Sequence, residues 1–202
     1  MISAAKAQYS TPTTTYSLLD ATTLPSSTLF APNSFDKIFS HAALHWILRQ
    51  ERDRLPVLKS LHGLLRPGGT FAGVFGAHGD CAEFHGALVG ALIHRGVPVQ
   101  AACNATPWYF ATEEEVRALF SAAGFVIESL ELELRQPELP DVAAWVKLFG
   151  ASFLEMVGEE QRNAVVDEVI EIVEGVGRKR GGGLKANYIR WRILARKGND
   201  HE

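Results

Sequence analysis

The sequence contains little cysteine and no long apolar run. Its only cysteines, Cys81 and Cys103, lack the paired spacing of a metal site, so we interpret them as reduced thiols of a cytoplasmic protein. No segment approaches the roughly 18 apolar residues of a membrane-spanning helix. No long apolar stretch follows Lys6, as it would in a secretory signal. These absences argue against disulfide-rich, secreted and membrane-spanning classes, and no membrane partner is expected.

Neither positive nor negative charge is in large excess. The chain carries 20 Lys and Arg against 23 Asp and Glu, a net charge of -3, so no global field attracts nucleic acid. The one basic cluster, "RKR" at 178–180, is too short to predict a nucleic-acid partner. No Gly-x-Ser-x-Gly motif of a hydrolase is present. Its 202 residues, 47% of them hydrophobic, predict one domain over 1–197 with a short tail at 198–202.

Histidine is frequent in the first half of the chain, but its spacing does not predict a metal site. The histidines concerned are His41, His45, His78, His85 and His94. Because no carboxylate or thiolate lies at ligand spacing from them, we expect no bound metal.

Strand and helix patterns alternate along the chain. Strand patterns occur at 16–20, 36–41, 70–76, 126–134 and 184–196. Helical patterns occur at 2–8, 57–65, 80–95, 112–123, 141–155 and 159–174. "RPGG" at 66–69 predicts a turn, and Thr112 with Glu115 predicts a capping box before a helix that ends at Gly124. The alternation predicts an α/β sheet, mostly parallel, with helices on both faces.

The segment "FDKIFSHAALHWI", residues 35–47, changes character where its strand ends. Apolar strand residues give way to Ser40, His41 and Ala42. Ligands of such sheets bind beyond the carboxyl ends of the strands. Small residues there leave room for a ligand and polar residues can orient it, so this turn is a candidate binding site.

Several motifs, in order, resemble a known family. "SLLDATTLP", "FDKIFSHAALHWI" and "LHGLLRPGGTFAGVF" together resemble the class I S-adenosylmethionine-dependent methyltransferases. "YFATEEEVRALFSAAGFVIESLELE", "PDVAAWVKLFGASFL" and "NYIRWRILARK" are similar to its trans-aconitate methyltransferase branch. The resemblance implies a Rossmann-like sheet and a methyl transfer from S-adenosylmethionine to a small molecule, for which a carboxylic acid is one candidate.

The resemblance also implies roles for two cofactor-binding segments. Asp20 would accept from the adenine amino group, with Ala21 beside it. Ser40, His41 and Ala42 would line the methionine end of the cofactor and the mouth of the acceptor site. His41 is the candidate catalytic residue.

The same resemblance implies an acceptor site. Its predicted residues are His45, Trp46, Trp108, Tyr109, Tyr188 and Arg190. Trp108 and Tyr109 would also suit a hydrophobic core, and Arg192 a solvent-facing strand position. Methyl transfer needs alignment and exclusion of water more than acid or base, and a carboxylate is already ionised near neutral pH. Arg190 can hold it in a bidentate fork; His41 or His45 could add a donor, or act as base on a hydroxyl.

Two features of the family are absent from the sequence. These are the glycine-rich turn after the first strand and the ribose-binding acid after the second, so the fold is expected to lack those first two strands. The Gly-x-Gly sequence "GVG" at 175–177 lies between a helix and a strand and is expected to be a flexible connection. We therefore expect weakened or lost binding of S-adenosylmethionine.

The same absence has two further consequences. The strand at 36–41 would form an exposed sheet edge, which predicts a homodimer through that edge. It also leaves an alternative function open: a non-catalytic remnant or fragment that acts, if at all, as a binding or scaffold protein.

Overall fold

A computed structural model describes residues 2–177 and 183–199 of the chain, so the "RKR" segment at 178–180 lies outside the described residues. The strands are β1 (Phe35–His41), β2 (Leu65–Gly76), β3 (Phe125–Arg135) and β4 (Tyr188–Lys197). The helices before β3 are α1 (Ile2–Tyr9), the 3-10 helix η1 (Ala21–Ser26), α2 (Leu44–Ile47), α3 (Glu51–Leu64), α4 (Ala82–His94), α5 (Val99–Asn104) and α6 (Glu113–Ala122). Those after β3 are α7 (Val142–Phe149), α8 (Ala151–Leu154) and α9 (Glu159–Gly177).

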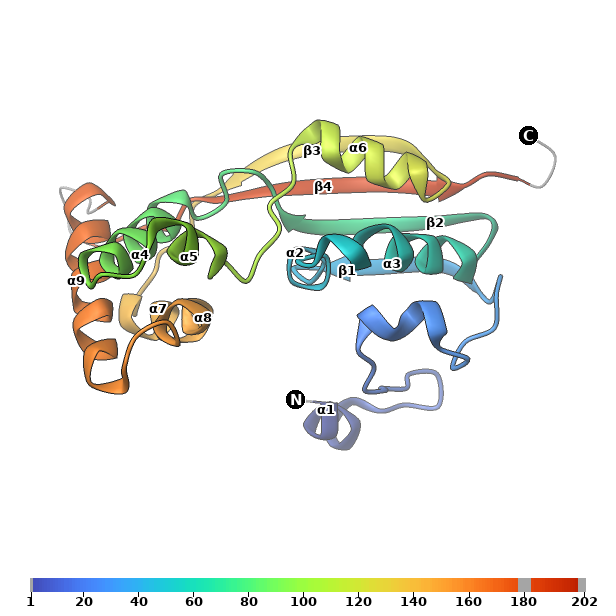
Figure 1. Cartoon of the computed structure of the whole chain (residues 1–202). Coiled ribbons are helices and arrows are strands. Elements are labelled where there is room, and N and C mark those ends of the chain that lie inside the picture. The colour runs from blue at the N-terminus through green and yellow to red at the C-terminus, as the bar shows by residue number, and fades with distance from the viewer. Residues whose placement is uncertain (1, 178–182, 200–202) are drawn as a thin grey trace.

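The four strands form one sheet in the order β1-β2-β4-β3 (Figure 1). β1 and β2 pair in parallel, whereas β4 pairs antiparallel with both β2 and β3. β1, β2 and β3 therefore point the same way, as expected, but the expectation of mostly parallel pairing is wrong because β4 inserts between two of them. Their carboxyl ends meet at one end of the sheet, next to the start of β4.

Helices cover one face of the sheet. α3 and α6 pack on this face, where the rings of Phe71, Phe120 and Phe125 lie 5.4 to 5.7 Å apart. On the opposite face Phe39 is 70% exposed and Val126 45% exposed. In the part of the chain that the structure describes, the prediction of helices on both faces is thus correct for one face alone.

A second hydrophobic core lies beyond the carboxyl ends of β1, β2 and β3. There α4, α5, α7, α8 and α9 form a helical lobe, at the left of Figure 1. Phe84, Leu88, Phe153 and Val169 are fully buried in it. The candidate site lies between this lobe and the sheet.

The predicted helix signals at 112–124 are confirmed. The Thr112 hydroxyl accepts from the Glu115 amide, and the Glu115 carboxylate accepts from the Thr112 amide. Gly124 follows the helix with φ 97°, a conformation that glycine adopts without strain.

The predicted strand at 16–20 is wrong. These residues belong to no strand, and the side chain of Leu18 is 84% exposed. A strand needs a paired neighbour for its backbone groups, and no strand in 2–177 or 183–199 lies beside this segment. Asp20 instead caps η1, where its carboxylate accepts from the amide and the hydroxyl of Thr22.

The "RPGG" segment is not a separate turn. β2 begins at Leu65, immediately after α3, and the segment is accommodated as an irregularity between the pairs Phe35–Leu65 and Lys37–Thr70. Gly68 supplies the required positive φ of 72°.

Two helix predictions also need correction. The helix expected at 141–155 divides at Gly150 into α7 and α8, consistent with the low helix propensity of glycine. α9 extends through Gly177, so "GVG" is the end of a helix and neither a loop nor a cofactor turn.

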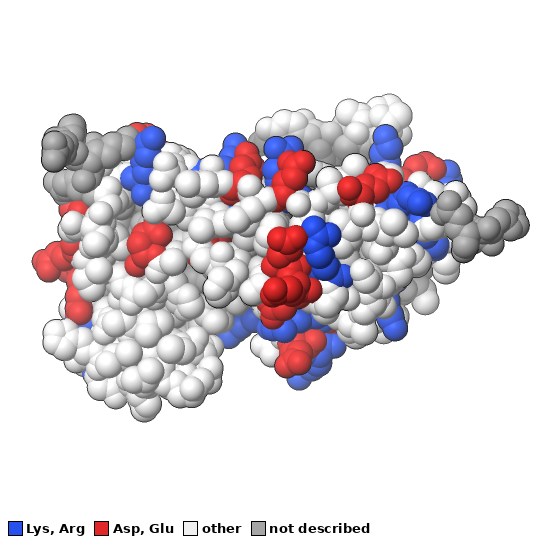
Figure 2. Space-filling view, turned by 90° about the horizontal axis from the view of Figure 1, so that it is seen from above, with Lys and Arg blue, Asp and Glu red and all other residues white. Residues whose placement is uncertain are grey.

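Charges of both signs are interspersed over α6 and β3 (Figure 2). Arg117 pairs with Glu113 at 2.8 Å, and Arg196 pairs with Glu128 at 3.5 Å. None of the helices in the described residues has the length and apolar character to cross a membrane.

Candidate active site

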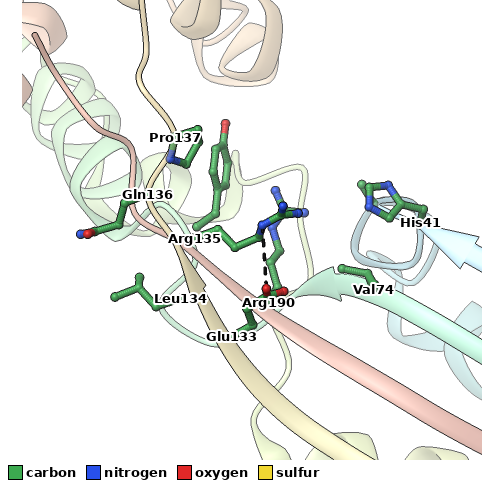
Figure 3. Close-up of a pocket in the computed structure, with 10 residues that line it drawn as sticks. His41, Val74, Glu133, Leu134, Arg135, Gln136, Pro137 and Arg190 are labelled. Atoms are coloured by element: carbon green, nitrogen blue, oxygen red, sulfur yellow. Dashed lines mark ion pairs between the residues drawn. The ribbon is translucent and has the colours of Figure 1, made fainter.

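The carboxyl ends of β1, β2 and β3 border a cavity of about 600 Å³, which we call the strand-end cavity. Its lining residues are His41, Ala42, Val74, Glu133, Leu134, Arg135, Gln136, Pro137, Tyr188 and Arg190. Figure 3 shows His41 and Arg190 projecting from separate strands into this space, and Arg135 paired with Glu133. Its volume lies within the range of about 300 to 1,000 Å³ that is usual for small-molecule sites.

The turn after β1 shapes one side of this cavity. Ala42 has φ 52°, which is unusual for a residue other than glycine, and its amide donates to Val74 O at 2.7 Å. This hydrogen bond to the neighbouring strand fixes the turn. Strained backbone of this kind concentrates at functional sites, and the small alanine side chain leaves the cavity open.

A second cavity, of about 120 Å³, lies beside the first and is lined mainly by aromatic rings. We call it the aromatic cavity; it is lined by Ala42, His45, Trp46, Asp80, Cys81, Trp108, Phe110, Trp145, Phe149, Tyr188 and Arg190. The rings of Trp108 and Phe110 stack with centroids 5.4 Å apart. Cys81 has φ 51°, so two of the three non-glycine residues with positive φ in the described chain, Ala42 and Cys81, line this cavity.

Arg190 lines both cavities and forms an ion pair with a buried carboxylate. Its Nε lies 3.8 Å from Oδ2 of Asp80, and its guanidinium lies 4.6 Å from the ring centre of Tyr188. Asp80 is 3% exposed, and its Oδ1 accepts from the Ile189 amide at 2.8 Å. The two terminal amino groups of Arg190 have no hydrogen-bond partner within 2–177 and 183–199. They are therefore available to a ligand.

Burial controls the protonation of the acidic groups around Arg190. Burial raises the pKa of Asp80 to about 6, although Arg190 and the Ile189 amide act in the opposite direction. Burial and the neighbouring Asp80 carboxylate also raise the pKa of Cys81 well above its usual range. Cys81 therefore remains a thiol, which lies 3.7 Å from Oδ1 of Asp80, and is not a nucleophile.

His45 is held as a neutral ring with a defined tautomer. Its Nδ1 accepts from the Gly76 amide at 3.1 Å, so the ring proton is assigned to Nε2. Burial, with a smaller effect of Arg190, lowers the pKa of His45 to about 4. His45 can consequently donate a hydrogen bond into the aromatic cavity. It cannot act as a base, because its basic nitrogen is already occupied.

Most of the residues predicted for the acceptor site lie together. His45, Trp46, Trp108, Tyr188 and Arg190 all line the aromatic cavity. Tyr109 does not: it points the other way, under the guanidinium of Arg54 at 3.6 Å, and packs with the sheet core. Adjacent residues of an extended segment face opposite sides, so Trp108 and Tyr109 cannot both face the cavity.

Some of the residues predicted to bind the cofactor line the strand-end cavity, and others lie away from it. His41 and Ala42 line the strand-end cavity. Ser40 is half-buried in β1 opposite Gly73. Asp20 is exposed beside η1 and is not among the residues of this cavity, and neither is Ala21. Their roles toward adenine remain predictions of the resemblance.

Several residues of the site were not identified from the sequence. These are Asp80, Cys81, Phe110, Trp145 and Phe149. Asp80 could have been predicted from the sequence, because it is an acidic residue shortly after a strand that ends at Gly76. The aromatic residues come from segments far apart in the chain, and sequence patterns alone do not bring them together.

The described residues contain no group of three or more His, Cys, Asp or Glu side chains arranged for a metal. Within the described residues, the two cavities are lined by aromatic rings, the buried Arg190–Asp80 ion pair and the more exposed Arg135–Glu133 ion pair. Such a set can bind and orient an organic anion.

Comparison with known proteins identifies the family. Residues 1–73 match the family described as a methyltransferase domain. An uncharacterised methyltransferase of Schizosaccharomyces pombe is 36% identical over 182 residues, which cover 89% of this chain and 67% of that protein.

Solved structures agree on the fold. A Bacillus halodurans C-125 protein described as a methyltransferase superposes with a TM-score of 0.53 at 14% identity, over 98% of this chain and 87% of that one. A structure described by the conversion of a disulfide bond into a thioacetal group during echinomycin biosynthesis superposes with a TM-score of 0.54 at 16% identity. The match covers 98% of this chain and 61% of that one. With the sequence relative, these findings show that the chain belongs to the class I S-adenosylmethionine-dependent methyltransferases.

Proposed function

We propose that the protein methylates a carboxylate oxygen of a small organic acid. The observation that carries this proposal is the free edge of Arg190. Its terminal amino groups line both cavities and have no partner within the described residues. A planar guanidinium binds a carboxylate through two parallel hydrogen bonds, and an acid anchored there would lie next to the turn at Ala42.

The ion pair with Asp80 supports this role of Arg190. Asp80 engages the Nε side of the guanidinium and fixes its direction, because the carboxylate is itself held by the Ile189 amide. The side chain of Arg190 is 17% exposed, so its charge is poorly hydrated and a second anion would interact with it strongly. A fixed and partly desolvated cation is well suited to positioning an acceptor.

The residues of the strand-end cavity are compatible with the methionine end of the cofactor. His41 and the positive-φ turn at Ala42 border a space large enough for a small molecule. S-adenosylmethionine supplies the methyl group: an oxygen–carbon bond forms as the carbon–sulfur bond breaks, and the electron pair of the broken bond remains on sulfur. Asp20 would hold adenine through Oδ2, because its Oδ1 already accepts from the amide and the hydroxyl of Thr22.

The chain's own residues act by orientation. A carboxylate acceptor is ionised near neutral pH, so no proton has to be removed. This agrees with His45, which is a donor and not a base. Arg190 aligns the acceptor, the aromatic rings keep water away, and His41 can hydrogen-bond at the cavity mouth.

Calorimetric titration of S-adenosylmethionine and S-adenosylhomocysteine into the 202-residue chain tests the cofactor part of the proposal. Micromolar binding supports the enzyme. A folded protein that does not bind at millimolar ligand supports the alternative, a non-catalytic binding protein, because "GVG" lies at the end of a helix and cannot serve as the glycine-rich turn.

A pair of variants tests the acceptor part. Arg190→Ala should lower methyl transfer to organic acids by about 100-fold or more while leaving cofactor binding close to wild type. Arg192→Ala is the matched control, because Arg192 lies on the same strand and is exposed outside both cavities. Equal activity of the two variants would contradict the assignment of Arg190.

A further inference from the structure

The aromatic cavity contains more apolar surface than the binding of a carboxylate requires. Besides Arg190 and Asp80, its walls are the rings of Trp46, Trp108, Phe110, Trp145 and Phe149, with Tyr188 beside them. A carboxylate placed against the faces of these rings would lose its hydration without a compensating positive charge. The rings therefore face a part of the ligand that is itself apolar.

The aromatic walls are preformed. Trp108 is 7% exposed and Trp145 6% exposed. The Trp145 indole N–H donates to the Tyr188 hydroxyl at 2.7 Å, which fixes both rings and satisfies the polar atom of Trp145. Phe153 packs behind Trp108 with centroids 6.1 Å apart. Because the cavity is shaped before a ligand binds, little ordering is needed on binding.

The volume of the cavity limits the size of this apolar part. The cavity measures about 120 Å³. A dry apolar cavity of about 150 Å³ accommodates benzene. The aromatic cavity is somewhat smaller, so it would hold a branched alkyl group or most of a single ring, and it is too small for two fused rings.

The charges at the cavity argue against a cationic ligand. Aromatic cages bind methylammonium groups when the rings or a carboxylate supply the attraction. Among the described residues that line the cavity, Asp80 is the one carboxylate, and it already contacts Arg190 and the Ile189 amide. A cation would also meet the guanidinium of Arg190. An anion with an apolar body satisfies both the ring walls and the free guanidinium edge.

We infer that the acceptor is a monocarboxylic acid whose carboxylate is held by Arg190 and whose compact apolar group, of about four to six carbon atoms, fills the aromatic cavity. This inference rests on the proposed function and narrows its substrate class. It also distinguishes the protein from the trans-aconitate branch that its sequence resembles, since a polycarboxylate would place charge against the rings.

The experiment is a calorimetric binding series on the full chain with five acids: acetate, 3-methylbutanoate, benzoate, 2-naphthoate and citrate. Each buried methylene group should tighten binding about fourfold. We expect 3-methylbutanoate and benzoate to bind at least tenfold more tightly than acetate, and 2-naphthoate and citrate to bind more weakly than benzoate. Citrate binding more tightly than benzoate, or equal affinity for all monocarboxylates, would overturn the inference.

A variant of the cavity wall tests the apolar contact separately from the contact between Arg190 and the carboxylate. Trp46→Ala should weaken the binding of 3-methylbutanoate and benzoate several-fold and leave the binding of acetate unchanged. It should also allow 2-naphthoate to bind. Trp46 is suitable because it is 37% exposed, so its removal should not prevent folding. Phe39→Ala, an aromatic residue outside both cavities, is the control. No selective change in Trp46→Ala would contradict the inferred location of the apolar group.

The same series distinguishes failure of this inference from failure of the proposed function. If no acid binds, or if Arg190→Ala leaves acetate and benzoate binding unchanged, the carboxylate function itself is wrong. If acids bind through Arg190 without dependence on the apolar group, only the inferred substrate class is wrong.

Discussion

The strand-end cavity and the aromatic cavity share Ala42, Tyr188 and Arg190, but they differ in the rest of their walls. The first is bordered by His41, Glu133, Arg135 and Gln136 at the ends of strands, whereas the second is bordered mainly by aromatic rings from α2, the segment before α6 and the helical lobe. The difference indicates a division of roles, in which the sheet supplies polar contacts and these rings supply apolar ones. The shared residues mark the place where two ligands would meet.

Replacing Arg190 should have the largest effect, because the proposed function assigns it the carboxylate of the acceptor. Charge-assisted hydrogen bonds contribute about 1.5 to 3 kcal/mol each, so Arg190→Ala should lower kcat/KM for acids by about 100-fold or more. Arg190→Lys keeps the positive charge but lacks the two parallel donors of the guanidinium. Its kcat/KM should therefore lie between those of wild type and Arg190→Ala. Steady-state kinetics on the three proteins, with Arg192→Ala as control, checks this order.

Asp80→Asn tests the buried ion pair through the pH dependence of stability. The pKa of Asp80 is raised from 3.8 to about 6, so its proton stabilises the folded state. This contribution is fully present below pH 4 and is lost as the pH rises through about 6, at a cost of roughly 3 kcal/mol. Arg190, Cys81 and Glu83 are the other charged or titratable groups that act on it.

Thermal unfolding between pH 4 and pH 7 measures this difference. Relative to wild type, Asp80→Asn should gain stability as the pH rises. A constant difference in stability between the two proteins across this range would show that Asp80 does not titrate there.

Asp20→Asn tests whether the segment outside both cavities contributes to cofactor binding. Asparagine is also a good helix N-cap, so η1 should persist, while an adenine amino group would lose an ionised acceptor. We expect about tenfold weaker binding of S-adenosylhomocysteine. Asp36→Asn, another exposed acid, is the control, and equal affinity of both variants would remove Asp20 from the site.

His41→Ala should have a smaller effect on catalysis. If the acceptor is already ionised, His41 contributes one exposed hydrogen bond, and its loss should reduce kcat less than tenfold. A general base would contribute about 100-fold or more. A large loss in kcat with unchanged KM would therefore show that the strand-end cavity performs proton transfer and that the acceptor is not a carboxylate.

Phe39→Lys should have the smallest effect on either cavity. β1 is an edge strand of the described sheet, and Phe39 is 70% exposed at its centre. We propose that a second copy of the chain covers this edge, because a two-fold pairing satisfies the same edge in both copies. Light scattering after size exclusion should give a dimer for wild type and a monomer for Phe39→Lys, and a wild-type monomer would contradict the proposal.

Much of the fold could be predicted because local signals were strong. The capping box at Thr112, the strand before His41 and the alternation around Arg190 each depend on residues close in sequence. The strand predicted at 16–20 failed because a strand also needs a neighbour, and the RPGG segment failed because β2 tolerates an irregular start. Local patterns do not contain either kind of information.

The site was predictable to the extent that it follows strand ends. His41 and Ala42 were found in this way, and Asp80 could have been, whereas Arg190 was predicted from the family resemblance. The pairing of Asp80 with Arg190 joins residues 110 positions apart. The opposite directions of Trp108 and Tyr109 depend on how one extended segment passes between two cores. These relations become visible only in the folded chain.

Methyl transfer to benzoate would directly show whether the protein methylates a carboxylic acid with a compact apolar group. The full chain would be incubated with S-adenosylmethionine carrying a labelled methyl group, together with benzoate or citrate, and the products separated by mass spectrometry. We predict labelled methyl benzoate and an equal amount of S-adenosylhomocysteine, with little ester from citrate. A folded protein that binds the cofactor but forms no ester from any acid would contradict the central claim.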